Sequence, residues 1–270
     1  MAIRSAIITV MIQAAYKAAP GLVHDFGEVE NLQVSMKGPS DFVTSADLQA
    51  ERVLRAELAR ARPAFGFLLE EAGVVKGTDE SHRWIVDPLD GTLNFLHGIP
   101  HFAISIALEH NREIVAGVIY DPLRDELFRA EKGGGAYLNN RRMRVSSRAE
   151  LSQAMIATGI PWRGRPRQSQ YLDWLAAVMT NCVGVRRLGS AALDLAYVAA
   201  GRYEGFWEPA LSPWDIAAGI LMVREAGGFV SEIDGGSWVL ASGDVLAAND
   251  RLHEPLLALL AAANATRGAT

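Results

Sequence analysis

Apolar residues follow two different periods along this chain, and the two periods alternate. In several stretches they recur every three or four positions, which is the spacing of one face of an α-helix. Between these stretches lie short β-branched and aromatic runs bounded by glycine, proline or aspartate, as in strands. The pattern predicts helices over residues 3–24, 46–60, 168–180, 190–200, 213–226 and 250–264, and strands at 66–69, 84–87, 103–109, 114–120, 126–131, 136–139, 154–158, 183–188, 203–208 and 227–233.

The predicted elements are ordered differently in the two halves of the chain. Residues 1–150 give helices followed by hairpin-linked strands, which is typical of an α+β arrangement, whereas residues 151–270 alternate helix and strand as in α/β proteins. The polar, weakly patterned segment near 143–153 separates the two patterns. We therefore predict one compact unit that consists of an N-terminal α+β half and a C-terminal α/β half.

The N-terminal stretch "SAIITVMI" could pass for the apolar part of a signal peptide. However, apolar residues from Ile3 to Ala18 recur at helical spacing, while Gln13 and Lys17 lie off that stripe. This spacing predicts an amphipathic helix packed on a core. No uninterrupted apolar run reaches the roughly 18 residues of a membrane span, so we expect no membrane contact.

Composition and charge narrow the classes of function. The chain has 270 residues, half of them apolar, which is enough for a large core. A formal net charge of −5 and a pI near 5.7 argue against general affinity for nucleic acid or anionic membranes. The single cysteine, Cys182, excludes an internal disulfide and cysteine-based zinc clusters. We therefore expect a cytoplasmic protein in which this cysteine is a buried apolar residue.

The segment "WIVDPLDGTLNF", residues 84–95, ends an apolar strand on two aspartates. Its proline and Gly91 force a turn, which can aim the carboxylates of Asp87 and Asp90 into one small volume. The Leu89 carbonyl and the Thr92 hydroxyl complete an all-oxygen donor set of the kind that suits Mg²⁺. Without a cation, repulsion would leave one of the two carboxylates protonated.

The residues after this turn predict a seat for phosphate. Thr92 begins a short helical stretch, "TLNFLHG", so the N–H groups of Gly91 and Thr92 can bind an anion beside the cation. An ordinary Asp-Pro turn would produce a similar pattern. The segment "YDPLRDEL" at 120–127 is such a case, because it lacks the second aspartate and the Gly-Thr pair, and it predicts a plain hairpin turn.

Further acidic residues lie where they could reach the same site. Glu70 and Glu71 end the apolar run "FGFLL", and carboxylates at the C-terminal end of a strand can face a shared cleft. Asp47 and Asp215 lie in the first turns of predicted helices. Both of these aspartates follow a threonine or serine by three residues, so each could equally be part of a capping box.

Taken in order, these segments resemble those of a known family. "LLEEAG", "WIVDPLDGTLNF" and "PWDIAAGILMVREAGG" resemble the signature segments of the inositol monophosphatase family of Mg²⁺-dependent, lithium-sensitive phosphatases. "KGPSDFVTSAD" and "RRLGSAALDLAYVAAGRYEGFWE" are similar to its bacterial members, and the resemblance covers about residues 5–260. It implies a layered αβαβα sandwich of the sugar phosphatase type, usually as a homodimer. Leu69 and Leu93 depart from it, since many members have glycine and a second threonine there.

The resemblance also implies roles for these residues. Glu70, Asp87 and the Leu89 carbonyl would hold a first Mg²⁺, and Asp87, Asp90 and Asp215 a second one. The Thr92 hydroxyl, hydrogen-bonded to Asp47 in family members, would orient the attacking water with Glu70 close by. The catalytic residues implied are thus Glu70, Thr92 and Asp47.

Substrate contacts are expected mainly from the second half of the chain. Gly189 and Ser190 begin a predicted helix whose N–H groups and small side chains leave room for a hydroxylated ring. Glu208 matches the family's ring-hydroxyl contact, although a surface glutamate at a strand end would look the same. His97 and His101 match no family role. The expected substrate-binding set is Asp90, Gly91, Thr92, Gly189, Ser190, Ala191, Glu208 and Asp215.

The resulting hypothesis is a phosphatase that hydrolyses inositol monophosphate, a small phosphorylated polyol, by metal-activated water. Fructose 1,6-bisphosphate, histidinol phosphate or a nucleotide 3′-phosphate are alternative substrates that family relatives use. Some bacterial relatives are accessory factors in transcription or RNA maturation, so a binding role is a further alternative, although we expect no direct nucleic-acid binding. A purely structural role is disfavoured, because burying convergent carboxylates costs stability unless a cation is used.

Overall fold

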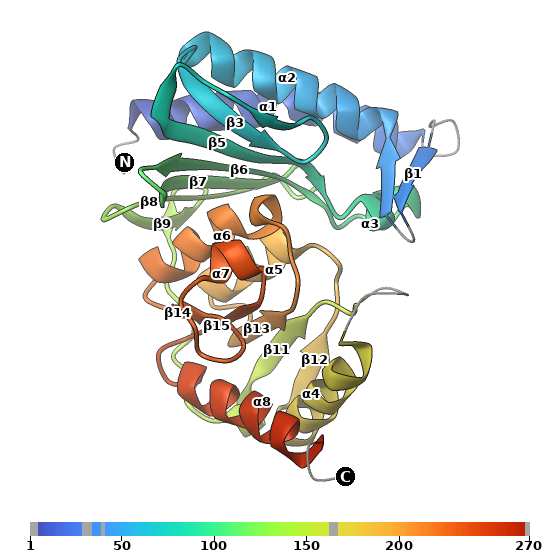
Figure 1. Ribbon diagram of the computed structural model, residues 1–270, viewed down its shortest axis with the longest axis vertical. Helices are drawn as coiled ribbons and strands as arrows, with labels where there is room; N and C mark the ends of the chain where they lie inside the picture. The colour runs from blue at the N-terminus through green and yellow to red at the C-terminus, as the bar shows by residue number, and fades with distance from the viewer. Residues whose placement is uncertain (1–4, 29–33, 39–40, 162–166, 268–270) are drawn as a thin grey trace.

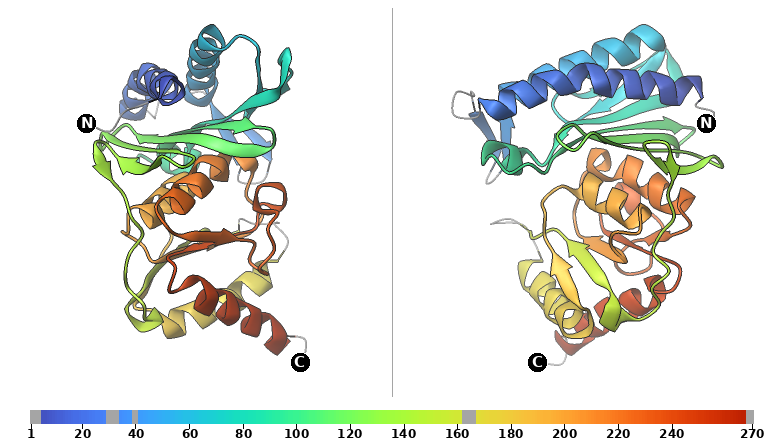
Figure 2. Two further views of the ribbon diagram at one scale, coloured as in Figure 1. Left: turned by 90° about the vertical axis from the view of Figure 1, so that its left-hand side faces the viewer. Right: turned by 180° about the vertical axis from the view of Figure 1, so that it is seen from behind.

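The computed structural model describes residues 5–28, 34–38, 41–161 and 167–267. Three layers of helices enclose two sheets, and Figures 1 and 2 show this layered αβαβα arrangement from three sides. The outer layers are α1 (Ala6–Gly27) with α2 (Ser45–Ala61), and α4 (Gln168–Asn181) with α8 (His253–Arg267). The middle layer contains α5 (Ala191–Ala199) and α6 (Pro213–Glu225), and the short helices are α3 (Thr92–Leu96) and α7 (Val239–Ser242).

The first sheet has eight strands in the order β10-β9-β8-β7-β6-β5-β3-β4. Its neighbours pair antiparallel, except that β3 and β5 are parallel, so the ends of these two strands meet at one edge of the sheet. Its strands are β3 (Phe65–Leu69), β4 (Gly73–Val75), β5 (Asp79–Asp90), β6 (Ala103–His110), β7 (Glu113–Asp121), β8 (Glu126–Glu131), β9 (Gly135–Leu138) and β10 (Arg141–Arg142).

The second sheet has five strands in the order β12-β11-β13-β15-β14. Strand β11 is parallel to both β12 and β13, and β15 is antiparallel to β13 and β14. A separate two-stranded ladder joins β1 to β2. The bounds are β1 (Val34–Gly38), β2 (Asp41–Thr44), β11 (Met155–Thr158), β12 (Gly184–Arg186), β13 (Gly205–Glu208), β14 (Phe229–Ser231) and β15 (Val245–Ala248).

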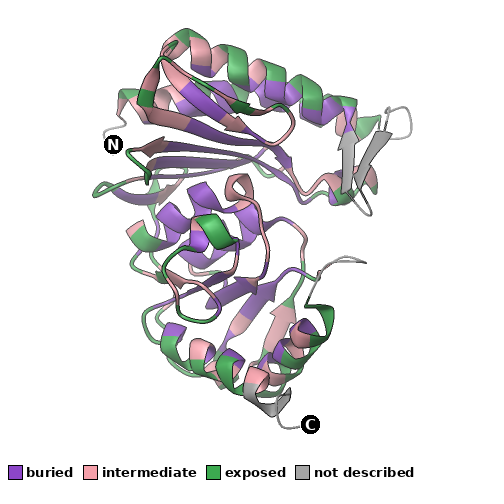
Figure 3. Ribbon diagram, in the orientation of Figure 1, coloured by how far each residue is buried: buried purple, intermediate pink, exposed green. Residues whose placement is uncertain are grey.

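Sheets cover the middle helices above and below, so α5 is buried on all sides and α6 is buried along its central part, Ile216–Val223 (Figure 3). Every residue of α5 is buried, and only Asp194 among them is charged. Successive side chains of strand β5 point to opposite faces of the sheet. Trp84 and Val86 therefore pack towards α1 and α2, while Ile85 packs towards α5 and α6. A sheet that is covered on both faces therefore gives the continuous apolar runs seen in the sequence.

Most predicted elements are confirmed, with small shifts at their ends. Each predicted helix and each predicted strand has a counterpart, although β5 extends well before the predicted 84–87. Helix α7 and strands β1, β2, β4, β10 and β15 were not predicted. The segment "YDPLRDEL" forms a hairpin turn between β7 and β8, as expected, and a second hairpin joins β8 to β9. The eight-stranded sheet ends before residue 143 and the five-stranded sheet begins at Met155, but the division into two halves stays a prediction.

Two expectations need adjustment, one about the N-terminal helix and one about the cysteine. Helix α1 is long and apolar enough, by length and composition alone, to cross a membrane, which was not predicted. One such helix is weak evidence for a membrane, because a core helix passes the same test, and Ile8, Met11 and Leu22 of α1 are buried. Cys182 is only half-buried, and burial raises the pKa of its thiol.

Candidate active site

The predicted site residues surround a cavity of about 350 Å³ at the interface between the first sheet and the middle helices. The ends of β3 and β5 supply one wall, and the starts of α5 and α6 together with the end of β13 supply the other. Asp87, Leu89, Asp47 and Ser190 are buried behind its surface. Of the predicted residues, those lining the cavity are Glu70, Asp90, Gly91, Thr92, Gly189, Ala191, Glu208 and Asp215.

Asp87 is an almost fully buried carboxylate of the site, with 1% of its surface exposed. Its Oδ1 accepts a hydrogen bond from the Leu89 N–H at 2.9 Å, which fixes the turn after the strand. Burial raises the pKa of Asp87 well above its usual value, and Glu70, Asp90 and Asp215 raise it further by charge repulsion. The four acidic residues therefore lie close enough to interact, as the sequence predicted.

Asp90 connects the first sheet to the start of α5. Its Oδ2 accepts hydrogen bonds from Ser190 Oγ at 2.5 Å and from the Ala192 N–H at 2.8 Å. A carboxylate at a helix N-terminus is stabilised by the N–H groups there. Burial nevertheless raises the pKa of Asp90 to about 6, since the hydrogen bonds from Ser190, Ala192 and Ala191 only partly offset it.

Thr92 and Asp47 are brought together across 45 residues of sequence. Thr92 Oγ1 lies 3.1 Å from Asp47 Oδ1 and 3.0 Å from the Leu89 carbonyl oxygen. A threonine hydroxyl has one proton, so it can donate fully to only one of these acceptors at a time. Burial raises the pKa of Asp47, and hydrogen bonds with Thr44 and Thr92 oppose that rise.

Both capping-box alternatives are also correct. Asp47 Oδ2 accepts a hydrogen bond from the Thr44 N–H at 2.9 Å, and Asp215 Oδ2 accepts one from the Ser212 N–H at 2.8 Å. Each aspartate thus uses one carboxylate oxygen to cap the start of its helix. The capping role is compatible with a place in the site, because the second oxygen of Asp47 lies 3.1 Å from Thr92 Oγ1 and Asp215 lines the cavity.

The turn at Gly91 requires glycine. Its φ of 99° is in the left-handed region, and a Cβ there would lie 3.0 Å from the His101 carbonyl oxygen. Just beyond it, Asn94 is buried and its Nδ2 donates to the carbonyl oxygens of His101 and Leu188, both at 2.8 Å. Asn94 therefore holds the loop before α5 against α3, a role that the sequence analysis missed.

Gly159 makes room for the predicted substrate contact. A Cβ placed on Gly159 would lie 1.9 Å from Glu208 Oε1, so any larger residue would displace this carboxylate. Gly159 was not predicted, although a glycine directly after a strand was a usable signal. Arg187 was not predicted either, and it is the only basic side chain among the described residues that line the cavity.

Asp194 is a second residue that the sequence analysis overlooked. It is buried inside α5, and burial together with the charges of Glu208 and Asp90 raises its pKa well above the usual value. A single acid in an otherwise apolar helix was its only signal. Neither His97 nor His101 lines the cavity, and burial lowers the pKa of His101 to about 4.

The acidic residues fit a hard cation by their chemistry, although the described residues contain no ready-made cluster of three or more metal-binding side chains. One oxygen each of Asp87, Asp90 and Asp215 accepts a backbone N–H, and Asp87 also shares a hydrogen bond with Glu70. Each carboxylate has a second oxygen, and with the Leu89 carbonyl these form an all-oxygen donor set. A divalent cation would remove the repulsion that raises the pKa of Asp87.

A first prediction concerns pH and stability. Asp87 and Asp90 have raised pKa values in the folded chain, so without a cation the folded state retains protons that the unfolded state has lost. The contribution of Asp90 to stability is fully present below pH 4 and is lost as the pH rises through about 6, and the contribution of Asp87 also falls as the pH rises. We expect Mg²⁺ to raise the melting temperature by about 5 °C at pH 7.5, at a concentration about 100-fold above its Kd, and by much less at pH 5.

The measurement is thermal unfolding in chelator and in Mg²⁺ at both pH values, with Na⁺ matched for ionic strength. Asp90→Asn serves as the comparison because it removes one of the two titrating carboxylates. An equal effect of Mg²⁺ at pH 5 and pH 7.5 in the parent would contradict a cation site made from these groups.

Comparison with known proteins finds matches over nearly the whole chain. The family model for the inositol monophosphatase family matches residues 4–265. Inositol-1-monophosphatase of Mesorhizobium japonicum is 60% identical over 254 residues, which is 94% of this chain and 96% of that protein. The Nus factor SuhB of Escherichia coli K12 is 42% identical, covering 93% and 94% of the two chains. The crystal structure of extragenic suppressor protein suhB from Bartonella henselae superposes with a TM-score of 0.93 at 57% identity, covering 95% and 98%.

Proposed function

This chain belongs to the inositol monophosphatase family, and from that premise we propose that it is a Mg²⁺-dependent phosphomonoesterase that hydrolyses inositol monophosphate to inositol and phosphate. One observation carries the proposal. Four carboxylates line a cavity of about 350 Å³, Arg187 is the one arginine among the described residues of its wall, and Asp87 is buried behind them. A phosphate dianion can enter such a site only when cations accompany it.

The donor positions suggest how two cations would be held. Glu70, Asp87 and the Leu89 carbonyl would hold one Mg²⁺, and Asp87, Asp90 and Asp215 would hold the other. Bound Mg²⁺ would supply positive charge for the phosphoryl oxygens and the leaving oxygen, and would lower the pKa of a water nucleophile. Charge repulsion from Glu70, Asp90 and Asp215 raises the pKa of Asp87, which is consistent with Asp87 belonging to both proposed sets of cation ligands.

The Thr92 hydroxyl is placed to orient the attacking water. When it donates its proton to Asp47 Oδ1, the Leu89 carbonyl oxygen is left for a cation and the Thr92 oxygen can accept a hydrogen bond from water. Asp47 is held rigidly by the capping box, so the direction of the hydroxyl is set by the start of α2. Glu70, at the end of β3, is the carboxylate placed to accept the proton of the water.

The opposite wall of the cavity suggests how the substrate is oriented. Glu208 lies against Gly159 and could accept a hydrogen bond from a ring hydroxyl, while Arg187 could pair with phosphate or donate to a hydroxyl. Gly189, Ser190 and Ala191 leave space beside the N-terminus of α5. The proposal also includes inhibition by Li⁺ and a homodimer, which the family resemblance implies, and a cytoplasmic location, which the single cysteine suggests.

We expect Glu208→Gln to separate substrate recognition from chemistry. A hydrogen bond to a charged acceptor contributes about 1.5 to 3 kcal/mol, or roughly ten- to a hundredfold in selectivity. The substitution should lower kcat/KM for inositol 1-phosphate by that factor and leave kcat/KM for p-nitrophenyl phosphate nearly unchanged, because the aryl ester has no ring hydroxyl. The measurement is phosphate release from both substrates in Mg²⁺ by the parent and the variant.

Glu254→Gln, at the exposed start of α8, is the matched control and should change neither rate. If both rates of the Glu208 variant fall equally, this residue serves catalysis or folding instead of recognition. If the parent releases phosphate from neither substrate, the proposed function itself fails. If it prefers fructose 1,6-bisphosphate, histidinol phosphate or a nucleotide 3′-phosphate, the reaction class holds but inositol is not the substrate.

The similarity to the Nus factor SuhB supports a second candidate role, as an accessory factor in transcription. The complete acidic set argues against a role in binding alone, because a protein that had lost catalysis would not need to keep these buried carboxylates. The two roles are compatible, and direct nucleic-acid binding is not expected from a net charge of −5.

A further inference from the structure

Glu51 is a buried carboxylate that the proposed reaction does not use. It lies in the second turn of α2, has 6% of its surface exposed, and is not among the described residues that line the active-site cavity. Burying a carboxylate costs free energy unless hydrogen-bond donors replace the water around it. The donors that surround Glu51 therefore indicate its role.

Both oxygens of Glu51 accept hydrogen bonds from the loop that follows β3. The Glu71 N–H donates to Glu51 Oε2 at 2.8 Å, and the Ala72 N–H donates to Glu51 Oε1 at 3.1 Å. Hydrogen bonds from N–H groups to a charged acceptor are roughly twice as strong as those between neutral groups. Glu51 thus fixes two successive peptide groups of the loop at once.

The loop that Glu51 holds also carries Glu70, the proposed proton acceptor. It consists of residues 70–72, because β3 ends just before it and β4 begins just after it. The Glu70 N–H donates to the Val86 carbonyl oxygen of β5 at 3.2 Å, and the other two N–H groups of the loop donate to Glu51. Without Glu51, two of the three N–H groups would lose their acceptor.

The same face of α2 holds the other group that is proposed to act on the water. Asp47 precedes Glu51 by four residues, so the two carboxylates lie one helical turn, or about 6 Å, apart on one face of the helix. Asp47 is fully buried, and its Oδ1 lies 3.1 Å from Thr92 Oγ1. One rigid turn of α2 therefore contacts both Thr92 and the loop that carries Glu70.

We propose that Glu51 is a positioning residue for phosphate ester hydrolysis, an inference that rests on the function proposed above. By holding the loop 70–72 against α2, it keeps the Glu70 carboxylate beside Thr92, where Glu70 can bind a cation and accept a proton from water. Glu51 itself contacts neither the substrate nor a cation. Residues that orient a cation ligand from behind typically change cation affinity or turnover by about 10- to 100-fold.

The main test is Glu51→Gln, which keeps the size of the side chain but replaces one acceptor oxygen by an NH₂ group. That group would face a backbone N–H, so the loop would lose one of its two contacts. We expect kcat in Mg²⁺ to fall about 10- to 100-fold for both inositol 1-phosphate and p-nitrophenyl phosphate, with KM nearly unchanged. A loss on both substrates distinguishes Glu51 from Glu208, whose substitution should affect inositol 1-phosphate alone.

A double-mutant cycle shows whether Glu51 acts through Glu70. If it does, Glu51→Gln should add little to Glu70→Gln, so the double variant should turn over about as fast as Glu70→Gln alone. A purely structural role predicts instead that the two losses multiply, and that result would overturn the proposal. Glu51→Asp, which keeps the charge but is one methylene shorter, should show a smaller loss and takes the place of the glutamine variant if that variant does not fold.

Two measurements without substrate test the same contact. In chelator, amide hydrogen exchange over residues 70–72 should be faster in Glu51→Gln than in the parent, because two of these N–H groups have Glu51 as their acceptor. Calorimetric titration with Mg²⁺ should show about tenfold weaker binding in the variant. Unchanged exchange, or a parental kcat in the variant, would overturn the proposal.

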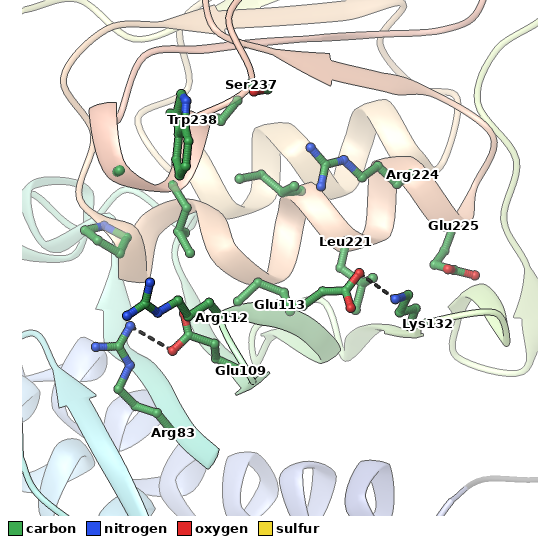
Figure 4. A pocket seen from close by; sticks show the side chains of 16 residues that line it. Arg83, Glu109, Arg112, Glu113, Lys132, Leu221, Arg224, Glu225, Ser237 and Trp238 are labelled. Carbon is green, nitrogen blue, oxygen red and sulfur yellow. Dashed lines mark hydrogen bonds and ion pairs between the residues drawn. The ribbon is translucent and has the colours of Figure 1, made fainter. Parts of the chain in front are cut away.

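Two carboxylates elsewhere in the chain provide matched controls. Glu57 lies further along α2 and pairs with Lys17. Glu109 lies in the first sheet and pairs with Arg83 at 2.8 Å beside a separate cavity of about 610 Å³ (Figure 4). Glu57→Gln and Glu109→Gln should keep the parent's kcat and its exchange in the loop after β3, and an equal loss of kcat in either would count against a specific role of Glu51.

The outcomes also separate this inference from the proposed function. If the parent releases phosphate from neither substrate, the proposed function fails, whereas the exchange and Mg²⁺ measurements still test the contact of Glu51 with the loop. If the parent is active and Glu51→Gln retains its kcat, the function stands and the positioning role fails.

Discussion

Asp87→Asn should abolish nearly all phosphatase activity while making the cation-free protein more stable. Asp87 is the residue proposed to contact both cations, so the loss of its charge should lower kcat by a factor of about 10³. The same charge destabilises the cation-free folded state, since burial and three neighbouring acids raise the pKa of Asp87. An asparagine keeps the side-chain oxygen that accepts the Leu89 N–H, so the turn should survive.

The measurement combines turnover in Mg²⁺ with thermal unfolding in chelator at pH 7.5. We expect the variant to melt at a higher temperature than the parent in chelator and to gain little from Mg²⁺. Glu204→Gln is a useful contrast, because Glu204 is equally buried but pairs with Arg148 and lies outside the cavity. Near-normal turnover of the Asp87 variant would exclude the proposed cation site.

Thr92→Val should lower kcat by roughly 10² with little change in KM for inositol 1-phosphate. Valine has nearly the same shape but no hydroxyl, so the water that Thr92 is proposed to orient would lose its partner. The Asp47 and Leu89 oxygens would also lose a donor, which should cost about 1 to 3 kcal/mol of stability.

Thr92→Ser is the matched variant, because it keeps the hydroxyl and loses only a methyl group. It should restore most of the turnover and most of the melting temperature. If serine restores stability but not turnover, the hydroxyl has no catalytic part. If valine lowers stability alone, Thr92 serves only to hold Asp47 and the turn together.

The sequence predicted best those elements whose own pattern determines them. Helices α2 and α6 begin at capping boxes and carry one continuous apolar pattern, so their ends fall within a few residues of the prediction. Strand β15 was missed because "VLAA" is short and has only one β-branched residue, and it becomes a central strand only through pairing with β13 and β14. Tertiary pairing of this kind leaves little local signal.

The same distinction holds for the site. The convergence of Asp87 and Asp90 follows from a local turn, so the sequence could predict it. The need for glycine at position 159 follows from the approach of Glu208, which is 49 residues away, and no local pattern expresses that contact. The sequence allowed two interpretations of Asp47 and Asp215, as helix-capping residues or as residues of the candidate active site. Only the three-dimensional arrangement shows that the two interpretations are compatible.

Helix α5 has no solvent-exposed side, and this constrains how relatives of the protein can diverge. A change of volume at any of its nine buried residues would disturb both sheets at once. The residues just before it, from Arg187 to Ser190, and the segment 159–161 instead face the cavity or adjoin it. New substrate preferences can therefore evolve through these short loops, while the helix that carries them remains almost unchanged.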